Sequence, residues 1–192
     1  MVGNQRRSVH LPFYGYLFAY FWSGMRPSEV SGLKWSHVDL AHETARVRHR
    51  YRGRLYGKKL KTKNAKRTVE LHPTLCAILR QMRPAKLHPH GFVFTNLRGE
   101  PIRPGAFSEL WYDALRVLDP PIRPRGLYQT KHTLCSLTVS SGDLNKLLWL
   151  EKQTGEPWET LRRHYATFFP TPPEERTTFR DLDPSLAKVA KG

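Results

Sequence analysis

Residues 23–36 read SGMRPSEVSGLKWS and place one arginine, Arg26, in a glycine turn just before a short helix. The twelve residues before this stretch are nearly all apolar or aromatic, which predicts a helix over 11–22 that Gly24 ends. Pro27 suits the first position of the next helix, and Glu29 suits its positive end. Arg26 therefore lies at a helix junction, where it either caps the carbonyls of the first helix or serves a function.

A tyrosine far along the chain, Tyr165, gives Arg26 a possible chemical partner. It lies in the basic end of another predicted helix. A guanidinium fork matches two phosphate oxygens, and a phenol can attack phosphorus. The two residues together suggest chemistry on a phosphodiester, although neither establishes it alone.

The composition indicates a polyanionic partner. The 192 residues include 32 Lys and Arg against 16 Asp and Glu, a formal charge of +16. Nucleic acid is the first candidate. An acidic membrane surface is the second, but no 18-residue apolar run, basic amphipathic helix or lipidation signal supports it. The length predicts one domain, and we expect Cys76 and Cys135 to be core thiols of a cytoplasmic protein.

The first half of the chain predicts a small basic sheet. Alternation over 44–51 predicts a strand with Ala45, Val47, His49 and Tyr51 on one face and three arginines on the other. Residues 58–62 and 66–71 flank a turn and predict an antiparallel hairpin with a cationic tip. A helix over 73–82 and a short apolar strand over 92–94 follow.

The second half is predicted to be helical. We expect helices over 104–118, 127–141, 144–152 and 157–166. The tail from Phe169 is rich in proline and then carries Leu182, Leu186 and Val189 at nearly helical spacing. It is either a tethered short helix or a frayed terminus. No internal repeat is present.

Five segments in order resemble the catalytic domain of the tyrosine recombinases, the phage integrase family. They are GMRPSEV (24–30), RTVEL (67–71) after a lysine-bearing hairpin, YQTKHTL (128–134), Gly155-Glu156 and RHY (163–165). The resemblance runs from about residue 11 to residue 168. It implies an α+β, mainly helical domain with a small antiparallel sheet over 1–168, and a tail over 169–192 that could dock on a neighbouring subunit.

The resemblance assigns roles to particular residues. Arg26 looks like the first catalytic arginine, and Tyr165 looks like the nucleophile that forms a 3′-phosphotyrosyl link without a metal. Lys61 best fits the hairpin lysine that protonates the leaving oxygen, with Lys63 as the runner-up. The implied activity is that of a site-specific DNA recombinase or integrase, encoded by a bacterium, phage or mobile element.

Two positions depart from the family pattern. The motif is typically His-x-x-Arg, and here its ends are Tyr128 and Lys131. Lysine keeps the charge but loses the planar fork, which we expect to weaken transition-state binding by about 1–3 kcal/mol. The next position, usually histidine or tryptophan, is Glu156. The resemblance therefore places Tyr128, Lys131 and Glu156 in the catalytic set with Arg26, Lys61 and Tyr165. An acid next to phosphate is unfavourable, so the expectation is that Glu156 faces solvent, and Trp158, in preference to His164, could turn inward instead.

Contacts with double-stranded DNA are expected on the basic strand, on the hairpin and beside the catalytic residues. Such contacts are mostly to phosphate and give affinity more than sequence choice. We expect a tetramer on DNA and a monomer off it, because the positive charge opposes self-association. The expected DNA contacts are Arg46, Arg48, Arg50, Lys63, Lys66, Arg67, His132 and Arg162.

Two other functions remain open at this point. The chain could be a DNA-binding remnant of a recombinase that lost efficient cleavage. It could also be an RNA- or ribosome-binding protein, which explains the charge but not the order of the motifs. No zinc-protease motif, Cys/His cluster or phosphate-cradling glycine loop is present. We therefore expect no metal, no cofactor and no small-molecule substrate.

Overall fold

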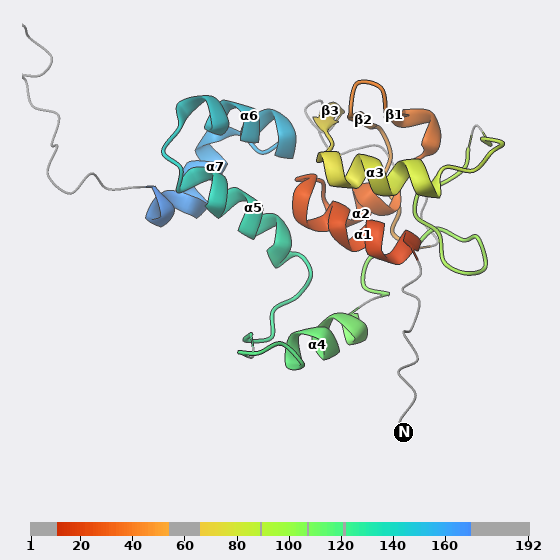
Figure 1. Ribbon diagram of the computed structural model, residues 1–192. Coiled ribbons are helices and arrows are strands. Elements are labelled where there is room, and N and C mark those ends of the chain that lie inside the picture. Colours follow the sequence, from red (N-terminus) through yellow and green to blue (C-terminus); the bar gives the residue numbers. More distant parts are fainter. Residues whose placement is uncertain (1–10, 54–65, 89, 107, 121, 170–192) are drawn as a thin grey trace, which may run out of the picture.

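The computed structural model describes residues 11–53, 66–88, 90–106, 108–120 and 122–169 (Figure 1). Three strands, β1 (Val38–Asp39), β2 (Thr44–Val47) and β3 (Arg67–Glu70), form an antiparallel sheet in the order β1-β2-β3. The predicted class, mainly helical with a small antiparallel sheet, is confirmed. The helices are α1 (Leu11–Trp22), α2 (Pro27–Ser31), α3 (Pro73–Met82), α4 (Ser108–Arg116), α5 (Gln129–Val139), α6 (Leu144–Thr154) and α7 (Trp158–Tyr165), with two 3₁₀ turns, η1 (Trp35–His37) and η3 (Ala166–Phe168).

The junction between α1 and α2 forms as the local sequence predicts. Gly24 has a φ of +65°, a conformation that side-chain-bearing residues rarely adopt. A Cβ on Gly24 would also lie 3.3 Å from side-chain carbons of Gln153 and Thr154, so the turn packs closely against the end of α6. Pro27 opens α2, and the backbone N–H of Arg26 donates to Glu29 at 2.8 Å in a capping box. This turn therefore brings Arg26 to the far half of the chain.

The strand predicted over 44–51 is shorter in the structure. Ala45 and Val47 are buried and Arg46 and Arg48 are exposed, as the alternation predicts, but β2 ends at Val47. The backbone N–H of Tyr51 instead donates to the carbonyl of Ser28 in α2 at 2.7 Å. Gly32 permits this approach, because a Cβ there would lie 2.9 Å from the backbone of residue 50. His49, predicted on the same face as the buried Ala45 and Val47, is only half-buried.

The second predicted hairpin strand is present as β3, and it pairs with β2. The register sets Thr44 opposite Glu70 and Val47 opposite Arg67. Residues 58–62, the first predicted hairpin strand, lie outside the described residues. The strand predicted over 92–94 is wrong, because this segment makes only an isolated bridge from Phe92 to Lys34.

Helix boundaries elsewhere agree closely with the sequence pattern. α1 and α3 match their predicted bounds, and α5, α6 and α7 differ by two residues or fewer at each end. α4 is shorter than predicted, since it begins at Ser108 and ends at Arg116. No helix in the described part of the chain is long and apolar enough to cross a membrane.

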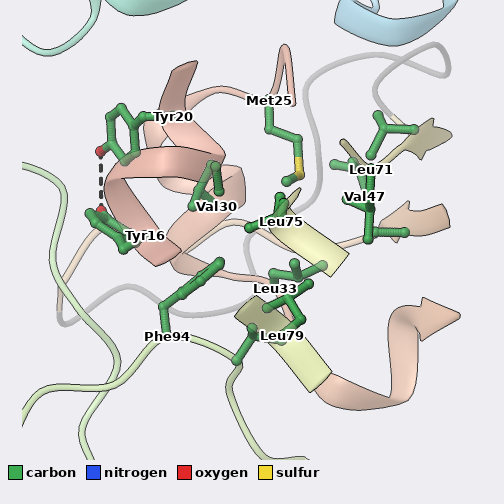
Figure 2. Packing of buried hydrophobic residues seen from close by; sticks show 14 of the residues in the cluster. Tyr16, Tyr20, Met25, Val30, Leu33, Val47, Leu71, Leu75, Leu79 and Phe94 are labelled. Atoms are coloured by element: carbon green, nitrogen blue, oxygen red, sulfur yellow. Dashed lines mark hydrogen bonds between the residues drawn. The ribbon is translucent and has the colours of Figure 1, made fainter. Parts of the chain in front are cut away.

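The buried hydrophobic side chains form two clusters. The larger joins α1, α2, the sheet and α3, and Figure 2 shows Tyr16, Met25, Leu75 and Phe94 among its members. The smaller joins α5, α6 and α7 and includes Tyr165. Figure 1 shows the two groups of helices side by side, and α1 packs on α5 while α6 packs on β3. Both cysteines are buried free thiols, as predicted.

Candidate active site

Arg26 projects from the turn before α2 into a cluster of charged side chains. Its Nη1 donates to Glu29 Oε1 at 3.2 Å, and its Nη2 donates to Glu156 Oε1 at 2.7 Å. The side chain is 36% exposed, so one face stays open to solvent. The alternative that Arg26 caps the carbonyls of α1 is not what the structure shows, because these guanidinium bonds go to carboxylates.

Glu156 turns inward, and the expectation that it faces solvent is wrong. The same oxygen, Oε1, accepts from Arg26 and from Lys131 Nζ, the latter at 2.9 Å. Gly155 ends α6 in the left-handed conformation, with φ of +66°, and thereby aims the next residue at these cations. The carboxylate occupies a position where two cations converge on one anionic oxygen.

The other residues considered for this position lie elsewhere. Trp158 packs its ring edge-on against Phe169, with 5.7 Å between the ring centroids. His164 is exposed on α7. Trp158 does turn inward, onto the smaller buried cluster, whereas Glu156 is the residue that pairs with Arg26 and Lys131.

The ion pairs and burial oppose one another in setting the protonation states. Burial raises the pKa of Glu156, but the cations of Lys131 and Arg26 outweigh burial and hold that pKa below its ordinary value. Burial lowers the pKa of Lys131, and Glu156 recovers only part of the loss. Lys131 is 5% exposed at its side chain, so it depends on Glu156 as a counter-ion.

Tyr165 ends α7 with its hydroxyl directed at α5. Its Oη lies 2.6 Å from Nδ1 of His132, and the residue is 7% exposed. Burial raises the pKa of the Tyr165 phenol well above its ordinary value, and Cys135 raises it further. Because His132 directly follows Lys131 in α5, the predicted nucleophile lies beside the cation cluster.

Tyr128 stands at the start of α5 and is 45% exposed. Its ring meets His132 edge-on, with 5.2 Å between centroids. It also lines an open cavity of about 910 Å³ with Arg26, Arg52 and Arg103. Three arginines line this one cavity, so its positive charge is complementary to that of phosphate groups. Arg52 and Arg103 carry no local signal in the sequence that sets them apart from other arginines.

The predicted DNA contacts divide into exposed and buried groups. Arg46 on β2 and Arg48 just after β2 are exposed, and with Lys66 and His37 they line a second cationic hollow of about 420 Å³. Arg50 is half-buried, and Arg162 is exposed on α7. Among the described residues, the exposed predicted DNA contacts therefore lie in two places, at β2 and on α7.

Arg67 is not an exposed contact, and its prediction as one is corrected. Its guanidinium pairs with Glu29 at 3.0 Å and donates through Nε to the carbonyl of Gln153 at 2.8 Å. The side chain is 7% exposed, and that of Glu29 is 2% exposed. Arg67 neutralises Glu29, and Glu29 in turn accepts a hydrogen bond from Arg26. Arg67 therefore positions Arg26 indirectly, through Glu29.

Lys61 and its alternative Lys63 lie outside the described residues, as does the tail over 170–192. Their predicted roles stay predictions.

Two supporting residues escaped the sequence analysis. Glu29 was seen only as an acid at a helix start, although its spacing from Arg26 is that of a capping box. Gln153 donates to the carbonyls of Ser23 and Glu70 and accepts from the backbone N–H of Glu70, all within 3.0 Å. It ties α6 to the Arg26 turn and to β3, and no local pattern marks it.

Comparison with solved structures shows the same fold in DNA recombinases. The chain is 16% identical, with a TM-score of 0.68, to a Tn1549 transposon integrase in complex with transposon right-end DNA, covering 97% of this chain and 61% of that one. XerA recombinase is 15% identical with a TM-score of 0.62, over 96% and 59% of the two chains. XerH recombinase bound to difH DNA is 17% identical with a TM-score of 0.54, over 94% and 47%. The chain thus spans about three fifths, or less, of these proteins.

The phage integrase family model matches residues 12–146, well over half of the chain. The chain therefore belongs to the phage integrase family, the tyrosine recombinases. No curated protein matches it in a sequence search.

Proposed function

We propose that this chain is the catalytic part of a site-specific DNA recombinase that cleaves and rejoins DNA strands through a 3′-phosphotyrosyl intermediate. One observation carries the proposal. Arg26 and Lys131, from separate elements, converge on a single carboxylate oxygen of Glu156. The hydroxyl of Tyr165 contacts His132, the residue that follows Lys131 in α5. Two cations converging on one anionic oxygen are what a scissile phosphate requires.

In this proposal each residue has a defined task. Arg26 and Lys131 hold non-bridging oxygens of the scissile phosphate and stabilise the charge that develops during attack. Tyr165 Oη attacks phosphorus, the P–O5′ bond breaks, and the 5′-oxygen leaves with a proton supplied by Lys61. Rejoining is the reverse step, in which a 5′-hydroxyl displaces Tyr165.

The proposal requires Glu156 to leave the position between the cations. An acid at this point competes with phosphate for both of them, and DNA must displace it before attack. Arg46, Arg48 and the cavity beside Tyr128 supply the surrounding phosphate contacts. The relatives solved with DNA support duplex DNA as the partner. Assembly into a tetramer on DNA, with the tail docking on a neighbour, is part of this proposal.

A second function is favoured by the same carboxylate. Glu156 neutralises two cations and Tyr165 is buried, which would suit a protein that binds DNA without cutting it. Such a protein would keep the positive surface charge that binds DNA but would not cleave DNA strands.

A trapping experiment distinguishes the two functions. The probe is a pool of nicked DNA duplexes with a randomised stretch beside the nick, so that the short 5′-hydroxyl fragment diffuses away after cleavage. Covalent adducts are separated on a denaturing gel and sequenced, which also identifies the preferred site. Tyr165→Phe is the test variant, and Tyr14→Phe, on an exposed tyrosine of α1, is its matched control.

The recombinase proposal requires an adduct from the unmodified chain and from Tyr14→Phe, and none from Tyr165→Phe. Salt-sensitive retention of the pool without any adduct would establish the binding function in its place.

A further inference from the structure

We propose that His132 is the general base that takes the phenol proton of Tyr165, an inference that rests on the proposed function. The contact is direct, since Nδ1 of His132 lies 2.6 Å from Oη of Tyr165. A heavy-atom separation within hydrogen-bond reach is the first requirement for a general base. The sequence analysis placed His132 only among the DNA contacts.

The position of His132 in the fold fixes this contact. It lies one turn along α5 from Tyr128 and next to Lys131, and its ring is 5.8 Å from that of Tyr165 between centroids. The ring is half-buried, held between the edge-on ring of Tyr128 and the end of α7. The imidazole therefore reaches Oη from the same helix that presents a phosphate-binding cation.

The other groups around Oη are poor bases. Lys131 has no lone pair while charged, and Glu156 is held by two cations that lower its proton affinity. Cys135 is buried and its pKa is raised, so it stays a neutral thiol. His164 is exposed on α7, and adjacent helical residues point about 100° apart, so its ring is directed to solvent and not along the Tyr165 side chain. Among the described residues, His132 alone brings a basic lone pair to Oη.

The charge environment keeps that lone pair available. Burial lowers the pKa of His132, and the positive charges of Lys131 and His164 lower it further, whereas Glu156 raises it. The ring is therefore neutral near pH 7, with one nitrogen protonated and the other free. Burial keeps the proton on the Tyr165 phenol, and in this proposal Nδ1 is the unprotonated nitrogen that accepts a hydrogen bond from Oη.

The proton balance of the step is complete. The Oη–P bond forms as the P–O5′ bond breaks, the phenol proton moves to Nδ1, and the leaving 5′-oxygen takes a proton from the general acid proposed above. His132 becomes an imidazolium. On rejoining it returns the proton to the departing phenolate, and the general acid recovers its own.

The test compares adduct formation rates of His132→Ala, His132→Asn and the unmodified chain on a duplex selected from the nicked pool. Loss of a general base costs about 10²- to 10⁴-fold in rate. Asparagine places an oxygen near the Nδ1 position, so it restores the hydrogen bond but cannot take the proton. We expect both variants to be slowed at least about 100-fold, with thermal melting as the check on folding.

A pH profile and nitrogen NMR add readouts that a positioning role would not change. The rate of the unmodified chain should fall as the pH drops through the lowered pKa of His132, because only the neutral ring accepts a proton. The acid limb should be absent from the residual rate of His132→Ala. Imidazole ¹⁵N shifts of the DNA-free chain should show Nδ1 unprotonated.

Three results overturn the inference. A His132→Asn rate within a few-fold of the unmodified chain would reduce His132 to positioning. A protonated Nδ1 would make it a donor to Oη. Absence of any adduct from the unmodified chain would remove the proposed function and this inference with it, whereas the first two results leave the proposed function intact.

Discussion

Replacing Glu156 by glutamine should lower the unfolding free energy of the DNA-free protein and raise the rate at which it forms a covalent adduct with DNA. Glutamine keeps the size of the side chain and removes its charge. In the structure that charge is shared by Arg26 at 2.7 Å and Lys131 at 2.9 Å. Because phosphate must replace the carboxylate between the same two cations, the variant removes an internal competitor.

The size of the gain follows from the contact that DNA has to break. A hydrogen bond to a charged group contributes about 1.5–3 kcal/mol. When phosphate displaces the carboxylate, we take its new contacts to offset one of the two bonds that Glu156 makes and the other bond to be the net cost. Glutamine removes this cost, which corresponds to roughly a 10- to 150-fold increase in adduct formation rate. The DNA affinity of the whole surface should change less, since the exposed arginines contribute most of it.

The stability change has the opposite sign. Lys131 is 5% exposed and loses its counter-ion in the variant. Breaking a fully buried ion pair costs about 3–5 kcal/mol, but Glu156 is 21% exposed and Arg26 is 36% exposed. We therefore expect a loss of about 1–3 kcal/mol in unfolding free energy.

The assay measures melting temperature without DNA and adduct formation rate on the selected duplex, for Glu156→Gln and for Glu159→Gln. The control removes the same charge from an exposed position in the first turn of α7. Glu159→Gln should change the unfolding free energy by less than about 0.5 kcal/mol. If the two variants form adduct at the same rate, Glu156 does not compete with phosphate and the reasoning is refuted.

Four further changes have defined outcomes. The lowered pKa of Glu156 means that its stabilising effect is present above the unfolded carboxyl pKa, about 4.3, and is lost as the pH falls through the folded value, so melting of Glu156→Gln should depend less on pH in this acid window. Arg67→Ala should lower the unfolding free energy by about 3–5 kcal/mol in denaturant titration, because Glu29 is left buried without its partner. Arg46→Ala should leave stability nearly unchanged and reduce the slope of log affinity against log salt by about 0.9, and an unchanged slope would remove Arg46 from the DNA surface. Lys131→Arg should speed adduct formation by roughly 5- to 150-fold through the planar fork, whereas a slower variant would show that the buried site does not admit guanidinium.

Much of the fold could be predicted because its signals are local. Helical periodicity set α1, α3, α5, α6 and α7 within two residues. The Arg26 turn followed from Gly24, Pro27 and Glu29, whose effects reach only one turn of helix. The strand over 44–51 failed past Val47, because the chain there bonds to Ser28 of α2, a contact that alternation cannot signal.

The sequence predicted most of the residues of the candidate site, but it did not predict which of their side chains contact one another. Arg26, Lys131 and Tyr165 were identified from motif order, yet Glu156 was expected in solvent and Arg67 on the DNA surface. Each error concerns a polar side chain whose partner lies on another element. Burial of a charge is favourable only where an opposite charge meets it, and the sequence does not show which charges meet.

The amino-acid sequence by itself determined the family, the helices, the charge and the turn that carries Arg26, because these depend on composition, periodicity and near neighbours. Tertiary structure alone decided that Glu156 lies between two cations, that Arg67 neutralises Glu29, and that His132 meets Tyr165. Arg26 and Glu156 are 130 positions apart, and His132 and Tyr165 are 33 apart. Contacts over such separations are set by the packing of α2, α5, α6 and α7, since short-range ion pairs and hydrogen bonds form only once those helices have fixed their side chains within about 3 Å of each other.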